Sequence, residues 1–210
     1  MAGRTKTVPF DSKEYWDERF SHEDQFDWLL SWDTLRHYLT PYLPSQKEPI
    51  LHLGCGNSPL PFEMADAGYK RIVNVDYSAC VIDKMVQLAQ GYDQLEWLTA
   101  DCVQDISPVR IHAPTYAVVL EKSLTDCIAC GDDDQLSRQH GMARQIASIQ
   151  PSHGLWLCVS FSDQRQPFPP YRLLHKIPVL VPQPNDKPGA PDIYYYLYVL
   201  QKTSDDLSTI

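Results

Sequence analysis

The sequence has no long apolar run and an excess of acidic residues, and both features exclude classes of protein. No run approaches the roughly 20 apolar residues that span a bilayer. The segment MAGRTKTVPFDSKEYWDERF also lacks the apolar core of a signal peptide. The 18 lysines and arginines are outnumbered by 27 aspartates and glutamates, whereas nucleic-acid binding depends on basic residues that neutralise phosphates. We therefore expect a soluble, cytoplasmic protein with no nucleic-acid or membrane partner, whose acidic charge suits a basic protein or a cationic small molecule.

A complete metal-binding motif is also missing. The six cysteines include one C-x-x-C pair, Cys127 and Cys130, and no second pair or neighbouring pair of histidines completes a zinc site. The other cysteines mostly lie within apolar segments, as buried thiols do in a reducing compartment. The pair is explained either by packing on a helix or by a metal or redox role. The sequence favours packing and predicts no metal site.

Aromatic residues are concentrated near the N-terminus, where EYWDERF and FDWLLSW hold Trp16, Trp28 and Trp32. Apolar residues recur there at helical spacing until prolines interrupt the pattern, at Phe26, Leu29, Leu30, Leu35, Tyr38 and Leu39. This spacing predicts a helical N-terminal arm over residues 1–45, ahead of a single domain over residues 46–210. The aromatic side chains either seal the arm to the core or make it a lid over a pocket.

From residue 49 onward, short apolar runs alternate with helical stretches, which is typical of repeated βα units and of an α/β fold. A proline-rich stretch over residues 162–191 predicts an irregular surface excursion. The last strand, which follows it, is expected to run antiparallel at or near a sheet edge. The expected strands are residues 49–54, 71–76, 95–101, 116–122, 154–161 and 192–202, and the expected helices are 60–69, 80–90 and 133–149.

The ends of the expected strands carry the candidate binding residues, because ligands of open α/β sheets lie beyond the carboxyl ends of the strands. The first strand ends in Gly-Cys-Gly-Asn at residues 54–57, a shortened glycine-rich motif without a third glycine. It suits either a tight turn or a close approach of a ligand to the backbone. Asp76 ends the second strand, at the offset where a carboxylate accepts hydrogen bonds from ribose hydroxyls. It could also cap a helix, although Ser78 could do so instead.

Two further strand ends carry polar residues. Asp101 and Cys102 follow the third strand, where the carboxylate can accept from the amino group of adenine and the Cys102 N–H can donate to a ring nitrogen. A turn-forming role for Asp101 explains the residue equally well. Glu121 and Lys122 end the fourth strand and must face the cleft or solvent, because unpaired charges are not retained in an apolar core.

Taken in order, these strand ends resemble those of class I S-adenosylmethionine-dependent methyltransferases, and more narrowly the group that includes eukaryotic elongation factor 1-alpha lysine methyltransferases. The resemblance covers roughly residues 14–160 and is carried by EYWDERF, FDW, LGCGNSPL, IVNVDYS, TADC and VVLEKSLTD. It implies a Rossmann-like, seven-stranded, mostly parallel sheet with helices on both faces and a helical N-terminal arm. It also implies S-adenosyl-L-methionine as the cofactor.

The resemblance assigns cofactor contacts to individual residues. The implied residues are Trp16, Phe20 and Trp28 closing over the cofactor from the arm, Gly54, Cys55, Gly56 and Asn57 at its methionine part, Asp76 and Tyr77 at the ribose, Asp101 and Cys102 at the adenine, and Glu121 with Lys122, of which Lys122 lies near the sulfonium. Two positions depart from the family. His52 stands where many class I enzymes have an acidic residue, and Ser123 replaces the glycine of the usual EKGTLDA motif.

Methyl transfer from a sulfonium is an in-line displacement, to which a protein contributes mainly proximity and alignment. An amine acceptor must be neutral when it attacks, so a nearby carboxylate would orient it or help remove its proton. We predict Glu121 and Asp126 as these catalytic groups and a protein lysine as the acceptor. The alternatives are a small-molecule N- or O-methyltransferase and a methyltransferase fold that binds partners without catalysis. An NAD-dependent dehydrogenase is disfavoured because the third glycine is missing.

The acceptor wall is expected from two loops. The proline-rich segment over residues 163–191 begins on the side of the sheet where loops shape binding sites. We expect it to form the wall together with residues 123–126. Residues 168–171 are then needed for methyl transfer and not for cofactor binding.

Overall fold

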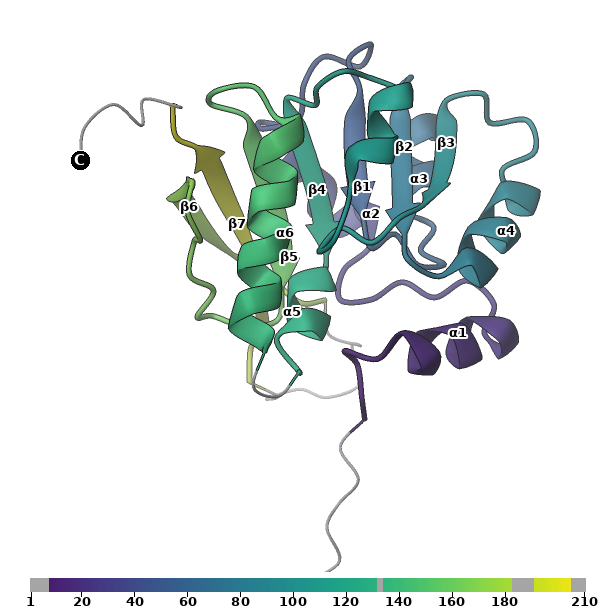
Figure 1. Ribbon diagram of the computed structural model, residues 1–210, viewed down its shortest axis with the longest axis horizontal. Coiled ribbons are helices and arrows are strands. Elements are labelled where there is room, and N and C mark those ends of the chain that lie inside the picture. Colours follow the sequence, from purple (N-terminus) through teal and green to yellow (C-terminus); the bar gives the residue numbers. More distant parts are fainter. Residues whose placement is uncertain (1–7, 132–133, 183–190, 205–210) are drawn as a thin grey trace, which may run out of the picture.

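The computed structural model describes residues 8–131, 134–182 and 191–204 of the chain (Figure 1). Its elements are, in chain order, α1 (Lys13–His22), α2 (Trp32–Leu39), β1 (Ile50–Leu53), α3 (Leu60–Asp66), β2 (Ile72–Asp76), α4 (Ala79–Leu88), β3 (Leu95–Thr99), the 3-10 helix η1 (Ser107–Ile111), β4 (Val118–Lys122), α5 (Leu124–Ile128), α6 (Gln135–Ile149), β5 (Leu155–Ser160), β6 (Tyr171–Leu180) and β7 (Tyr194–Lys202).

The strands of the described residues form one seven-stranded sheet in the order β3-β2-β1-β4-β5-β7-β6. Neighbours among β1 to β5 are parallel, and β7 lies antiparallel between β5 and β6. The chain runs outward from β1 to β3 and then returns to β4 on the other side of β1. The carboxyl ends of β1 and β4 therefore meet where the strand order reverses, which is where ligands of such sheets lie. The predicted Rossmann-like sheet with a late antiparallel strand is confirmed.

The prediction of an irregular segment over residues 162–191 is wrong in its middle part. Tyr171–Leu180 forms β6, which pairs with β7 along its length. Proline discouraged this assignment because it removes a donor from the sheet. Pro178 is tolerated because β6 is an edge strand and needs no hydrogen bonds on its outer side. Residues 183–190 lie outside the described residues.

The predicted helical arm is correct in kind, and α2 holds the second half of the predicted pattern, but the first half is not helical and α1 lies before it. Helix α1 begins after Ser12, whose hydroxyl accepts a hydrogen bond from the Tyr15 amide (3.3 Å). The next segment is not helical, and Leu29 has a φ of 65°. Helix α2 starts only at Trp32. Phe26 fitted the helical spacing but is 42% exposed, so its position in the pattern did not reflect a buried helix face.

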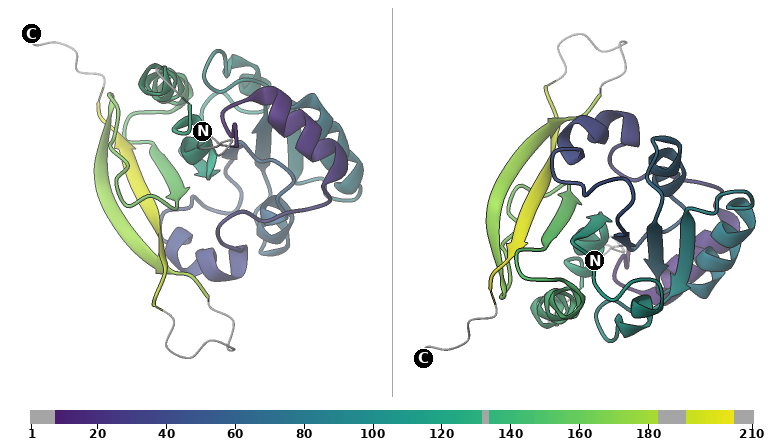
Figure 2. Two further views of the ribbon diagram at one scale, coloured as in Figure 1. Left: turned by 90° about the horizontal axis from the view of Figure 1, so that it is seen from below. Right: turned by 90° about the horizontal axis from the view of Figure 1, so that it is seen from above.

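Helices cover both faces of the sheet (Figure 2), because successive strand residues point to opposite faces. Leu51 and Leu53 of β1 pack in one apolar cluster with Met142 of α6. Ile50 packs on the other face, in a cluster with Leu35 of α2. A third, smaller cluster joins α1 to α4. Across the part of the chain that the structure describes, none of the helices has the length and apolar character needed to cross a membrane.

Candidate functional site

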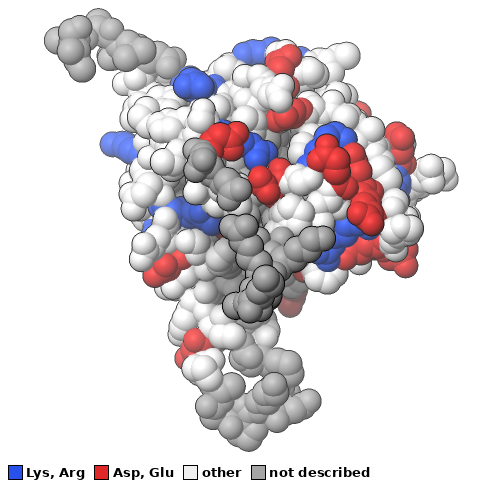
Figure 3. Space-filling view, turned by 60° about the horizontal axis from the view of Figure 1, so that its bottom comes forward, with Lys and Arg blue, Asp and Glu red and all other residues white. Residues whose placement is uncertain are grey.

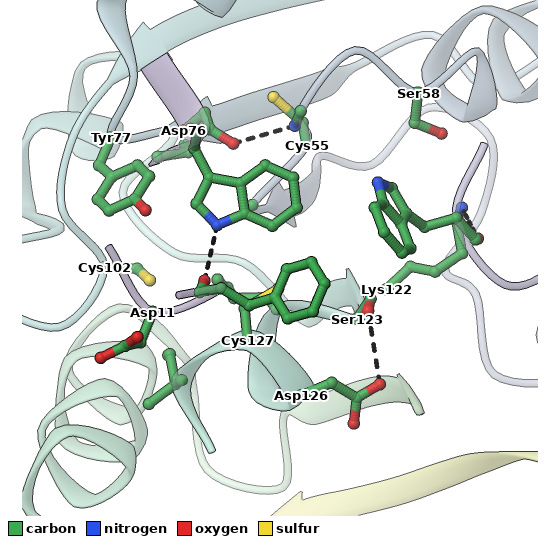
Figure 4. A pocket seen from close by; sticks show the side chains of 18 of the residues that line it. Asp11, Cys55, Ser58, Asp76, Tyr77, Cys102, Lys122, Ser123, Asp126 and Cys127 are labelled. Atoms are coloured by element: carbon green, nitrogen blue, oxygen red, sulfur yellow. Dashed lines mark hydrogen bonds between the residues drawn. The ribbon is translucent and has the colours of Figure 1, made fainter. Parts of the chain in front are cut away.

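A cavity of about 250 Å³ lies at the carboxyl ends of β1, β2 and β4, under the arm (Figure 4). All cofactor residues expected from the sequence line it, with the exception of Glu121. They are Trp16, Phe20, Trp28, Gly54, Cys55, Gly56, Asn57, Asp76, Tyr77, Asp101, Cys102 and Lys122. The fold thus brings together residues that are spread over more than half of the sequence.

The turn after β1 uses its glycines for backbone geometry. Gly54 and Gly56 have φ values of 58° and 50°, in the left-handed region that favours glycine. A β-carbon on Gly54 would lie 2.9 Å from Leu124 Cδ1, and one on Gly56 would lie 3.4 Å from Phe20 Cζ. A side chain at Gly54 would therefore collide with α5, and the turn keeps the backbone open toward the cavity.

Asp76 ends β2 and faces this turn. Its Oδ2 accepts a hydrogen bond from the Gly56 amide (3.0 Å), and its Oδ1 accepts one from the Ser78 amide (3.0 Å). Burial raises its pKa to about 6, although both amides favour the carboxylate. Ser78 caps α4, so the alternative role of Asp76 as the capping residue belongs to Ser78 instead.

The end of β3 contributes Asp101 and Cys102 to the cavity. Asp101 Oδ1 accepts a hydrogen bond from the Val103 amide (2.8 Å). It therefore has the turn-forming role that the sequence left open, and it lines the cavity as well. Burial raises the pKa of the Cys102 thiol, with Asp101 as a second cause, so this sulfur stays protonated.

The arm covers the cavity with aromatic side chains. The rings of Trp16 and Phe20 stack with their centroids 5.4 Å apart, and both residues are buried. Trp16 Nε1 donates to the Phe10 carbonyl oxygen (2.7 Å). Trp28 also lines the cavity, and its indole N–H is buried without a hydrogen-bond partner among the described residues. An aromatic roof of this kind excludes water from whatever occupies the cavity.

Polar contacts tie the middle of the arm to the loops beneath it. Ser78 Oγ donates to Asp17 Oδ1 (2.5 Å). Asn57 Nδ2 donates to Glu23 Oε2 (3.2 Å) and to the carbonyl oxygen of Asp24. Asn57, which was expected to contact the cofactor, is thus already engaged by the arm.

The two ends of the arm are held by ion pairs. Near its C-terminal end, Lys122 Nζ lies 2.6 Å from Asp27 Oδ1, and 2% of the lysine side chain is exposed. Near its N-terminal end, Arg138 Nη1 of α6 lies 3.7 Å from Asp11 Oδ2, and 25% and 31% of the two side chains are exposed. Sequence reasoning missed Asp11, Asp27 and Arg138, since no local pattern marks their pairing.

Glu121 does not face the acceptor as expected. It is fully buried and does not appear among the described residues that line the cavity. Its Oε2 accepts hydrogen bonds from the Leu124 and Thr125 amides (2.9 and 3.2 Å), and its Oε1 accepts from Thr125 Oγ1 (2.7 Å). Burial raises its pKa to about 7. Successive residues of β4 point to opposite faces, so Glu121 holds the start of α5 while Lys122 lines the cavity.

Asp126 lines the cavity, but its carboxylate is fully engaged. Its side chain is 3% exposed, and Oδ1 lies 2.6 Å from Arg165 Nη2 and accepts from Ser160 Oγ. Its Oδ2 accepts from the Phe161 amide (3.1 Å). Phe161 lines the cavity and is 51% exposed. Asp126 therefore fixes the loop after β5, and sequence reasoning missed both Arg165 and Phe161.

Only some of the residues expected in the acceptor wall line the cavity. Ser123, Leu124 and Asp126 line the cavity, whereas none of the described residues in 163–182 does. Phe168 instead packs against the core on the α6 side of the sheet. Ser123, which replaces a glycine of the family motif, has a φ of 70°, so it adopts the left-handed conformation that glycine tolerates more easily.

Three other residues with open roles have clear environments. His52 is buried under the turn, its Nδ1 lies 3.1 Å from Asn74 Oδ1, and burial lowers its pKa to about 4, so the ring is neutral. Cys127 and Cys130 both line the cavity. Burial raises the pKa of both thiols, with Asp126 as the next cause, which disfavours reactive thiolates. The described residues contain no group of three metal-ligating side chains.

No protein-family model matches the chain. Methyltransferase srdJ of Neurospora crassa is 33% identical over 207 residues, which cover 95% of this chain and 87% of that protein. The chain belongs to the methyltransferase family. An eEF1A lysine and N-terminal methyltransferase of Mus musculus is 29% identical over 158 residues, which cover 73% of this chain and 22% of that protein. EEF1A lysine methyltransferase 4 of the same species is 30% identical over 132 residues, which cover 61% of this chain and 50% of that protein.

Solved structures agree on the fold of this methyltransferase. An S-adenosylmethionine-dependent methyltransferase from Anabaena variabilis has a TM-score of 0.64 and 10% identity, with 93% of this chain and 95% of that chain covered. The N-methyltransferase NodS from Bradyrhizobium japonicum, in complex with S-adenosyl-L-homocysteine, has a TM-score of 0.62 and 11% identity, with 94% and 100% covered. The chain thus has the fold of enzymes that use S-adenosylmethionine.

Proposed function

We propose that this methyltransferase binds S-adenosylmethionine in the cavity under the arm and transfers its methyl group to a protein lysine. The observation that carries the proposal is Asp76, which ends β2 beside the left-handed turn of residues 54–57 and lies beneath an aromatic roof. When bound, the cofactor supplies a methyl group on a positively charged sulfur, which is already activated for transfer.

The residues around the cavity fit this cofactor. The Asp76 carboxylate suits the two ribose hydroxyls, and Asp101 with Cys102 suits the adenine. Gly54 and Gly56 present backbone without a side chain toward the cavity, where the methionine part would lie. The unpaired Trp28 N–H gives one more donor at this wall. The aromatic roof keeps water away and holds the methyl donor, S-adenosylmethionine, in one orientation.

Chemistry at the acceptor end depends on alignment more than on a base. Asp126 is paired with Arg165 and Glu121 does not line the cavity, so neither carboxylate is placed as a base for the acceptor amine. We assign Asp126 a positioning role: it fixes Phe161 and the left-handed Ser123 at the place where the acceptor enters. The amine then attacks in its neutral form, after its proton has left to solvent. Correct placement of reactants accounts for about 7–11 kcal/mol of a barrier in favourable cases.

A lysine-bearing protein is favoured as the acceptor by relatives and by charge. Relatives of the chain are named as eEF1A lysine methyltransferases. Residues 11–33 hold eight acidic and two basic residues, and Figure 3 shows Asp and Glu gathered on the side where α1 lies. An acidic surface attracts a basic segment and speeds encounter.

All six cysteines are free thiols, which supports a reducing compartment such as the cytoplasm.

The test is transfer of a labelled methyl group. The purified protein is incubated with tritiated S-adenosylmethionine and either eEF1A or a fractionated cell extract, and the Asp76→Ala variant serves as the control. We expect label on a lysine of a protein, located by mass spectrometry, and none with the variant. Label confined to the small-molecule fraction would replace the lysine assignment with the metabolic alternative. Absence of transfer to any fraction would contradict the proposal.

A further inference from the structure

Lys122 is the last residue of β4, and its side chain reaches the arm. Its ammonium group donates hydrogen bonds to Asp27 Oδ1 (2.6 Å) and to the Trp28 carbonyl oxygen (2.5 Å). Ser58 Oγ donates to the same Asp27 oxygen (2.8 Å). Two residues from the body of the domain therefore hold one short segment of the arm at the edge of the cavity.

The surroundings of Lys122 contain more negative than positive charge. Asp27 Oδ2 and Glu63 Oε2 are both buried without hydrogen-bond partners among the described residues. Burial and the neighbouring Asp27 raise the pKa of Glu63, and Lys122 opposes this effect. Burial lowers the pKa of Lys122, while Asp27 and Glu63 favour its charged form. Loss of the ammonium group would leave these two carboxylates, each with one buried and unpaired oxygen, without this cation.

The backbone beside this contact also needs support. Leu29 has a φ of 65°, which costs energy in a residue with a β-carbon. The neighbouring Trp28 lines the cavity, and Leu30 is buried in the cluster with α2 and α3. The hydrogen bond from Lys122 to the Trp28 carbonyl oxygen thus fixes the point at which the arm turns from the cavity to the core.

We propose that Lys122 is a positioning residue, which acts through Asp27 and the Trp28 backbone to fix the arm across the cavity and does not contact the methyl donor. This assignment differs from the place near the sulfonium that the family resemblance implied. It rests on the proposed function for its effect on donor binding. The docking of the arm itself can be measured without any donor.

The experiment combines amide hydrogen exchange with calorimetry on the full chain. Exchange over residues 13–31 is measured in the donor-free protein, and the affinity for S-adenosylhomocysteine is measured separately. The variants are Lys122→Met, Lys122→Arg and the double variant Asp27→Asn with Lys122→Met. Lys84→Met is the matched control, because Lys84 Nζ also donates to a carbonyl oxygen of the arm, that of Glu23, and lies 3.8 Å from Asp24 Oδ1, but its side chain is 31% exposed.

We expect Lys122→Met to speed exchange of the arm at least tenfold and to weaken S-adenosylhomocysteine binding at least tenfold. Lys122→Arg keeps the charge and should fall between this variant and the original protein. The double variant removes the carboxylate that Lys122→Met leaves without its cation, so it should recover part of the slow exchange and of the affinity, and not all, because the hydrogen bond to the Trp28 carbonyl oxygen stays absent. Lys84→Met should change either quantity less than twofold.

Two results would overturn the proposal. One is Lys122→Met with unchanged exchange of the arm and lost affinity, which would mean that the ammonium group contacts the ligand directly. The other is a double variant no better than Lys122→Met. If Lys122→Met does not fold, Lys122→Arg and the double variant are compared with the original protein instead. Lost affinity with unchanged exchange of the arm in these variants would overturn the proposal in the same way. If the original protein does not bind S-adenosylhomocysteine, the proposed function fails and arm exchange alone decides this proposal.

Discussion

The two ends of the arm are attached by the same kind of contact in different surroundings. Asp27 and Lys122 form a pair 2.6 Å apart in which the lysine side chain is buried (2% exposed) and the aspartate side chain is 21% exposed, and Ser58 supports it. Asp11 and Arg138 form a longer and more exposed pair, 3.7 Å apart, whose side chains are 31% and 25% exposed. A buried pair is strongly destabilising to break because one charge is left without its partner, whereas a surface pair contributes little and is screened by salt.

The difference indicates how the cavity is reached. The ion pair where the arm approaches α2 is shorter and less exposed than the ion pair at its N-terminal end. Trp16 and Phe20, between the two ends, form the part of the roof that would move with α1. We therefore expect opening to start near Asp11 and to pivot on the segment that Lys122 holds.

Breaking the buried end should have the largest effect. Asp27→Ala leaves Lys122 buried without its carboxylate, so we expect a loss of about 3–5 kcal/mol in the free energy of unfolding. Urea denaturation of the donor-free protein measures this change. A loss below about 1 kcal/mol would mean that the pair behaves like a surface contact.

Glu121 sharpens the comparison, because it is a buried carboxyl group held by hydrogen bonds instead of a cation. Its pKa is raised from 4.5 to about 7, so the folded state keeps a proton that the unfolded chain loses between these values. Stability should fall as pH rises through this window, by up to about 3 kcal/mol for this group. Urea denaturation at pH 5 and pH 8 should show this fall relative to Glu121→Gln. Parallel pH profiles of the two proteins would contradict it.

Breaking the more exposed pair, Asp11–Arg138, should have a small effect. Asp11→Asn should cost less than about 1 kcal/mol of stability. Hydrogen exchange should become faster over residues 8–16 and stay unchanged over residues 24–31. Equal changes in both segments would show that the arm is released as one unit and not from its N-terminal end.

Salt gives the mildest test of the same difference. At 1 M salt the Debye length is about 3 Å, so surface pairs are screened while buried pairs are affected much less. Exchange over residues 8–16 should rise by less than threefold on adding salt, with no change over residues 24–31. A larger rise at the Lys122 end would reverse the assignment of the two ends.

Features that a short stretch of sequence encodes could be predicted, whereas contacts between residues far apart in the sequence could not. The turn of residues 54–57 and Asp76 were found because an apolar strand that stops at glycine or aspartate is a local signal. β6 was missed because Pro178 argues against a central strand and the sequence does not show that this strand is an edge. Asp27 and Lys122 are 95 residues apart, and Asp126 and Arg165 are 39 apart, so only the fold pairs them.

The same holds for the candidate site, where positions along the chain could be predicted and side-chain orientations could not. Residues at strand ends could be placed at the cavity from the order of the strands alone. The orientation of Glu121 could not, because it depends on which face of β4 is covered by α5. Phe161 was read as the last residue of a strand, and its exposure at the cavity follows from the loop that Asp126 and Arg165 hold.

Calorimetric titration with S-adenosylhomocysteine tests the central claim most directly, since it asks whether the cavity under the arm binds the methyl donor's product. We predict binding to one site, weakened at least tenfold in Asp76→Ala, because each hydrogen bond from a ribose hydroxyl to a carboxylate contributes about 1.5–3 kcal/mol. NAD should give no heat of binding. Absence of binding by S-adenosylhomocysteine, or equal affinity in the Asp76→Ala variant, would contradict the account.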